Sequence, residues 1–74
     1  MIEVQYWLGL WHSGGEPLEI VNKNEALDNT ELNTSWRSLS YPGTDYIISK
    51  VLEPITDIGG KATQVVIVEE YESY

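Results

Sequence analysis

The chain has no cysteine, and His12 is its single histidine. Without cysteine it can form neither a disulfide framework nor a thiolate zinc site, and reactive-thiol chemistry is excluded. One histidine also excludes a histidine-rich metal site. A Ser-His-Asp arrangement would have to combine His12 with a serine such as Ser13, Ser35 or Ser40, and no motif brings these residues together. We therefore expect no catalytic residue.

Other motifs for chemistry are incomplete. The oxygen-bearing side chains between residues 22 and 31 lack the regular spacing of a calcium-binding loop. The glycine pairs at residues 14–15 and 59–60 are too short to be phosphate-binding loops, and neither is followed by Lys-Ser or Lys-Thr. The sequence predicts no metal, no cofactor and no enzymatic activity.

Positive charge is scarce. Twelve Asp and Glu residues oppose four Lys and Arg residues, which gives a formal net charge of −8 over 74 residues. Lys and Arg are the residues that neutralise phosphates, so this composition disfavours direct contact with nucleic acid or with an anionic membrane. The acidity has two interpretations. It can simply favour solubility, or it can attract a partner with a basic surface, including a groove built for DNA or RNA.

Long apolar runs are missing as well. No stretch approaches the roughly 20 apolar residues that span a bilayer, and the chain does not open on a basic segment followed by an apolar one. We expect a soluble, cytoplasmic protein that does not contact a membrane. No linker or repeat divides the sequence, so residues 1–74 are expected to form a single acidic domain in which residues 69–74 are an acidic tail.

An alternating pattern predicts a strand at the start of the chain. In residues 2–10 every second side chain is apolar: Ile2, Val4, Tyr6, Leu8 and Leu10. Trp7 and Trp11 fall on the opposite face of this strand. Residues 18–21 are expected to form a short second strand beside it, and the preceding Pro17 favours an edge position.

A second sheet signal lies near the C-terminus. Residues 46–52 and 63–68 are rich in the β-branched and aromatic side chains that suit strands. Residues 57–60, which include two glycines, supply a turn between them. We therefore expect a hairpin that the rest of the chain must cover, because an isolated two-stranded ribbon is only marginally stable.

The middle of the chain predicts a helix. Two residue pairs have the spacing of a helix cap: Asn22 with Glu25 and Asp28 with Glu31. Three apolar residues then fall on one helical stripe: Leu32, Trp36 and Leu39. We expect a helix over about residues 30–40, ended by Pro42 and Gly43. The predicted class is α+β, with a small antiparallel sheet of three to four strands in ββαββ-like order and one helix packed on it.

Two regions supply candidate binding residues. Trp7 and Trp11 are either covered by another element or act as anchors of an interface, where tryptophan is enriched. The acidic and aromatic C-terminus comprises Glu69, Glu70, Tyr71, Glu72 and Tyr74. It either forms a solvated end that protects a sheet edge, or docks on Lys and Arg of a partner.

These features favour a binding protein over an enzyme. We expect a small acidic interaction domain whose partner is a larger protein with a basic surface, for example an inhibitor that occupies a nucleic-acid-binding site. Virus- and plasmid-encoded inhibitors of polymerases, nucleases and CRISPR effectors are commonly small, acidic and free of cysteine, an analogy of size and composition only. The alternative is a structural or adaptor subunit that assembles with itself through a strand edge or the Trp7/Trp11 face.

Overall fold

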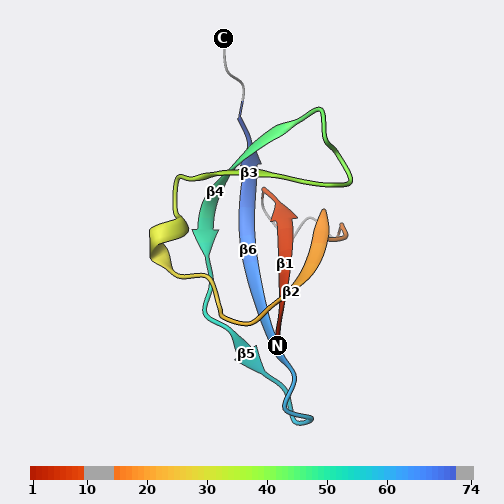
Figure 1. Ribbon diagram of the computed structural model, residues 1–74, viewed down its shortest axis with the longest axis vertical. Coiled ribbons are helices and arrows are strands. Elements are labelled where there is room, and N and C mark those ends of the chain that lie inside the picture. Colours follow the sequence, from red (N-terminus) through yellow and green to blue (C-terminus); the bar gives the residue numbers. More distant parts are fainter. Residues whose placement is uncertain (10–14, 72–74) are drawn as a thin grey trace.

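The computed structural model of the protein describes residues 1–9 and 15–71. Six strands form one sheet: β1 (Ile2–Leu8), β2 (Glu19–Lys23), β3 (Ser35–Arg37), β4 (Asp45–Val51), β5 (Ile55–Thr56) and β6 (Ala62–Glu70). The strand order is β2-β1-β6-β4-β3, and β5 also pairs with β6 (Figure 1). Strands β1 and β6 run parallel, whereas the other pairs are antiparallel.

Strand β6 is the centre of the sheet because three other strands pair with it along its nine residues. Its apolar, β-branched sequence suits a strand with neighbours on both edges. Together with β1 and β4 it supplies a buried cluster: Val4, Tyr6, Tyr46, Ile48, Val66 and Val68. We call the side of the sheet that carries this cluster the core face.

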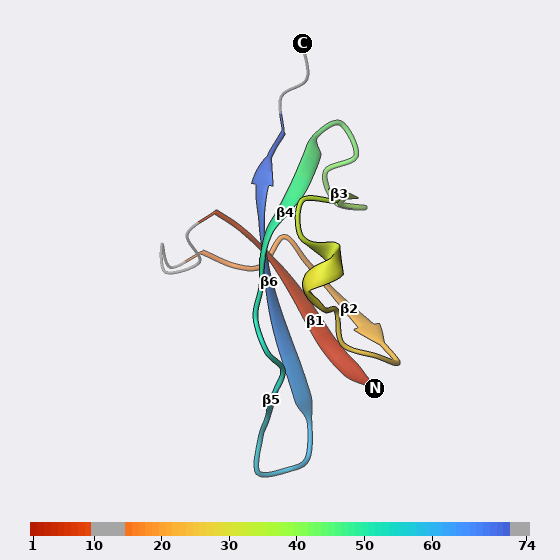
Figure 2. The ribbon, with the colours of Figure 1, turned by 90° about the vertical axis from the view of Figure 1, so that its left-hand side faces the viewer.

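The sheet curls until its two ends approach each other over the core face (Figure 2). Trp36 of β3 stacks on Tyr6 of β1, with ring centroids 4.2 Å apart and planes within 13°. The carboxylate of Glu19 in β2 accepts hydrogen bonds from the Ser38 hydroxyl (2.9 Å) and the Leu39 backbone N–H (2.7 Å). Side-chain contacts therefore join the ends of the curled sheet.

A buried glutamine fastens the segment after β2 to the core face. Gln64 is fully buried in β6, and its side chain bonds to the backbone N–H and C=O of Leu27 and to the C=O of Leu52. These three bonds satisfy the hydrogen-bonding groups of the buried Gln64 side-chain amide. A polar residue can therefore occupy the core at this position.

The predicted helix over residues 30–40 is wrong. Within the described part of the chain the only helical segment is η2 (Asn29–Glu31), a single 3₁₀ turn. Asp28 does cap this turn, because its side chain accepts the Thr30 N–H. Asn33 then adopts a left-handed backbone conformation (φ 65°), which ends helical propagation. The predicted apolar stripe is also not formed, since Trp36 lies in β3 and Leu39 is 88% exposed.

The α+β class with a three- to four-stranded antiparallel sheet is likewise wrong, because the structure is a curled, mixed, six-stranded sheet. The strands expected near residues 2–10, 18–21, 46–52 and 63–68 are all present. The sequence pattern identified these strands but not the parallel pairing between the first and the last. No helix of the described residues is long and apolar enough to cross a membrane.

Candidate binding face

The side of the sheet opposite the core face carries the candidate site. Strand register places these side chains together on it: Glu3, Gln5, Trp7, Ile47, Lys50, Thr63, Val65, Ile67 and Glu69. We call this set the open face. Among the described segments, η2 and β3 lie on the opposite side of β6, so they do not cover it (Figure 2).

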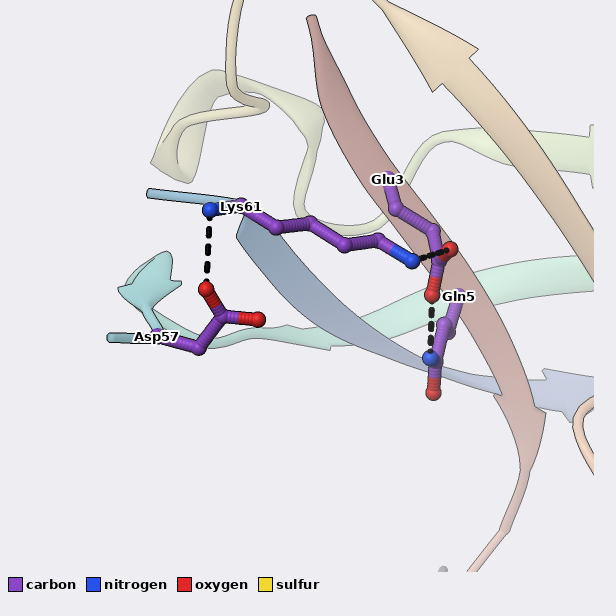
Figure 3. Close-up of polar contacts among 4 residues, drawn as sticks. All are labelled: Glu3, Gln5, Asp57 and Lys61. Atoms are coloured by element: carbon purple, nitrogen blue, oxygen red, sulfur yellow. Dashed lines mark hydrogen bonds and ion pairs between the residues drawn. The ribbon is translucent and has the colours of Figure 1, made fainter. Parts of the chain in front are cut away.

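A chain of hydrogen bonds runs along β1 on the open face and ends at Trp7. Lys61 Nζ lies 2.9 Å from Glu3 Oε1, and the amide of Gln5 donates to Glu3 Oε2 at 2.8 Å (Figure 3). The indole N–H of Trp7 donates to Gln5 Oε1 at 3.0 Å. Successive outward side chains of one strand thus hold the indole in a fixed orientation.

The ion pair at the other end of this chain is electrostatically favourable. The Lys61 ammonium, with help from the Gln5 amide, lowers the pKa of the Glu3 carboxyl. Glu3 in turn raises the pKa of the Lys61 amine. Both groups therefore stay charged over a wider pH range than they would in an unfolded chain.

The middle of the open face is apolar. Ile67 is only 6% exposed, although it is not part of the core cluster. In register it lies between Trp7 on β1 and Lys50 on β4, whose long side chains flank it. Val65 and Ile47, both partly buried, continue the apolar surface on either side. The open face therefore offers an aromatic and aliphatic centre that a partner could cover.

The structure separates the predicted C-terminal site residues. Glu69 pairs in register with Ile47 and lies on the open face, whereas Glu70 pairs with Tyr46 and lies on the core side. The Tyr71 N–H donates to the Asp45 C=O at 2.8 Å, and the exposed Tyr71 ring lines a shallow pocket with Ile47. Glu69 thus shares the open face with Trp7, Tyr71 borders this face through Ile47, and Glu70 does not lie on it.

Three predicted binding residues, Trp11, Glu72 and Tyr74, lie outside the described residues, as does His12. Glu69 and Glu70 are the last residues of β6, so this strand runs two residues further than the sequence pattern indicated.

Sequence reasoning missed most of the open face. Glu3 and Gln5 could have been found, because they alternate with the core residues of β1 and share the phase of Trp7. Val65 and Ile67 could not, since residues 65–68 are all apolar and show no alternation that would assign a face.

Among residues 1–9 and 15–71, no group of three His, Asp or Glu side chains could hold a metal ion. No protein-family model, curated protein or solved structure matches this chain.

Proposed function

We propose that this chain is a cytoplasmic protein-interaction domain that inhibits a larger protein by covering a basic, nucleic-acid-binding surface with its open face. The observation that supports this proposal is Trp7, an oriented tryptophan beside aliphatic side chains on a sheet face that η2 and β3 do not cover. The proposed targets handle nucleic acid inside the cell, which is the reason for assigning the cytoplasm.

The fixed orientation of Trp7 suits an interface anchor. Its hydrogen bond to Gln5, and the bond of Gln5 to Glu3, are made before any partner arrives. Little side-chain entropy is then lost on binding, and a large aromatic surface is available for contact. Residues of this kind dominate interface energetics.

The charges around the apolar centre favour a basic partner. Glu3 and Asp45 are engaged in ion pairs with Lys61 and Arg37. Glu69 is exposed and forms no ion pair within the described residues, and the whole chain carries a net charge of −8. This field accelerates encounter with a cationic surface and would slow encounter with nucleic acid.

A second copy of the chain is the other candidate occupant, and it corresponds to the self-assembling alternative. The apolar centre of the open face would suit a symmetric contact. Two copies that each carry a charge of −8 repel each other, however, and this repulsion disfavours self-association at low ionic strength. A dimer that forms only at high salt would identify this alternative in sedimentation velocity experiments.

The first test is affinity capture with the tagged chain from lysate of the cells in which it is made, washed in parallel at low and high salt. We expect one larger protein to be retained at low salt and depleted at high salt. Trp7→Ala should lose this protein, with binding weaker by about 2 kcal/mol or more. Leu39→Ala is the matched control, because Leu39 is an exposed apolar residue outside the open face.

Adjacent acids provide a sharper control once the partner is purified. Glu69→Lys and Glu70→Lys change the net charge equally, but only Glu69 lies on the open face. Glu69→Lys should slow association more than Glu70→Lys in surface plasmon resonance. Equal effects of the two reversals, together with unchanged capture by Trp7→Ala, would refute the proposed surface.

A further inference from the structure

The hairpin formed by β5 and the start of β6 projects beyond the other strands at one end of the molecule (Figure 1). We call residues 55–61 the β5–β6 arm. Ile58 is fully exposed and Ile55 is 72% exposed. The turn that joins β5 to β6 is nevertheless well defined, because the Asp57 N–H donates to the Lys61 C=O and the Lys61 N–H donates to Asp57 Oδ1. The arm thus presents aliphatic side chains on an ordered hairpin.

A hollow lies beside this arm on the open face. The Leu52 N–H still bonds to Val65, but pairing with β6 resumes only at Ile55, opposite Thr63. Pro54 lies in the intervening stretch and has no N–H to donate, which favours this break. The hollow measures about 240 Å³, and its lining residues are Leu52, Glu53, Ile55, Asp57, Lys61, Thr63 and Val65.

The size and walls of the hollow limit what it can hold. Leu52, Ile55 and Val65 give it an aliphatic lining, to which Thr63 adds a methyl group. Its volume is below the roughly 300–1,000 Å³ of typical small-molecule sites. A single apolar side chain of a partner protein matches these dimensions better than a metabolite does.

The rim of the hollow carries negative charge. Lys61 is the one cation among the lining residues, and its ammonium is drawn toward Glu3 of β1 at 2.9 Å (Figure 3). Glu53 and Asp57 form no ion pair within the described part of the chain. A cation next to the inserted apolar side chain would therefore meet two carboxylates, while Glu3 offsets the charge of Lys61.

We infer that this hollow binds an aliphatic side chain of the partner that is flanked in sequence by lysine or arginine. The inference rests on the proposed function and specifies the partner's chemistry. The apolar side chain fills the space between Leu52, Ile55 and Val65, and the flanking cations meet Glu53 and Asp57. A second copy of this acidic chain fits the rim less well, because its surface is dominated by carboxylates.

The test uses the full ¹⁵N-labelled chain and three acetylated, amidated pentapeptides, each with glycine at both ends. Their central residues are Lys-Leu-Lys, Lys-Ala-Lys and Glu-Leu-Glu. We expect the first peptide to shift the backbone amide signals of Ile55, Thr63 and Val65 in heteronuclear NMR spectra. The other two should bind at least about tenfold more weakly, because one loses the apolar contact and the other brings like charges together.

Two charge-reversed variants provide the matched control. Glu53→Lys should weaken binding of the Lys-Leu-Lys peptide at least about tenfold, as expected where like charges replace an attractive pair. Glu25→Lys changes the net charge equally, at an exposed position outside the hollow, and should leave the affinity within about twofold of wild type.

The inference would be overturned by the absence of a shift at the hollow, by equal shifts with the alanine peptide, or by equal losses of affinity in the two variants. Shifts confined to the indole N–H signal of Trp7 would overturn it too, while leaving the proposed function standing. The proposed function fails separately, if partner capture does not depend on Trp7.

Discussion

Tyr6 and Trp7 are neighbours in β1, yet they meet opposite surroundings. Tyr6 is 3% exposed and stacks on Trp36, and its burial, aided by the charges of Glu31 and Glu19, raises the pKa of its phenol. Trp7 is partly buried, and its indole N–H bonds to Gln5 of the same strand. The pleat alone sends them to different faces. One aromatic side chain then builds the core, and the other remains available for contact.

Strand β6 shows that residue polarity does not decide which face is covered. Gln64 is fully buried on the core face, whereas the apolar Val65 beside it lies on the open face. The core face accepts a glutamine because backbone groups of Leu27 and Leu52 satisfy its amide. Coverage by the rest of the chain therefore distinguishes the two faces better than composition does.

Alanine substitution of Tyr6 and of Trp7 should give the largest difference in stability between the core face and the open face. Tyr6→Ala removes a buried ring and its stacking on Trp36, and should lower the free energy of unfolding by about 3–5 kcal/mol. Trp7→Ala should cost only about 1 kcal/mol, because Trp7 is only partly buried and is not part of the core cluster. Urea denaturation followed by circular dichroism measures both values.

Tyr6→Phe is the control that keeps this comparison measurable if Tyr6→Ala does not fold. It keeps the stacked ring and should lose much less stability than Tyr6→Ala. If Trp7→Ala were as destabilising as Tyr6→Ala, Trp7 would be a structural residue and the open face would need another explanation.

The second comparison, between Gln64 and Thr63 of β6, should give a smaller difference in stability. Gln64→Leu leaves the backbone groups of Leu27 and Leu52 without their partner inside the fold, at a cost of about 2–3 kcal/mol. Thr63→Ala, one residue earlier on the open face, should stay within about 0.5 kcal/mol of wild type. The same denaturation experiment applies. A neutral Gln64→Leu would show that the bonds of this amide add nothing to stability.

The sequence predicted the strands better than their assembly. In β1, an apolar side chain at every second position predicted both the strand and the face that is buried. The pairing of β1 with β6 joins residues about 60 positions apart in parallel. No local pattern specifies such a contact, because the paired residues lie far apart in the sequence.

The helix was predicted from spacing that the structure uses differently. Trp36 has helical spacing with Leu32 and Leu39, but its ring is needed against Tyr6 and Tyr46 on the core face. Asn, Thr and Ser around it have little helical preference, so tertiary packing decides the conformation. Trp7 was predicted as a binding residue from its phase in β1, whereas the hollow beside β5 arises from a break in pairing that no periodicity encodes.

The smallest expected effect on stability concerns the ion pair between Lys61 and Glu3, from which the hydrogen bonds to Gln5 and Trp7 continue. The pKa of Glu3 is lowered mainly by Lys61, so the pair contributes stability above the unfolded carboxyl pKa of about 4.3. This contribution is lost as the pH falls through the folded pKa of Glu3. The pKa of Lys61 is raised by Glu3, so the contribution also disappears as the pH rises through the folded pKa of Lys61, above about 10.4.

The free energies of unfolding of Glu3→Gln and wild type should therefore differ most between about pH 6 and 9. They should converge at acid pH, where Glu3 is protonated, and at alkaline pH, where Lys61 is neutral. Urea midpoints measured across this pH range test the expectation. Lys61→Gln should show the same convergence at acid pH, because it breaks the same pair. Asp28, whose pKa is lowered by the Thr30 hydroxyl and N–H, remains in both variants and should preserve part of the acid dependence. A difference between Glu3→Gln and wild type that does not change with pH would mean that Glu3 orients Gln5 and Trp7 by hydrogen bonding alone.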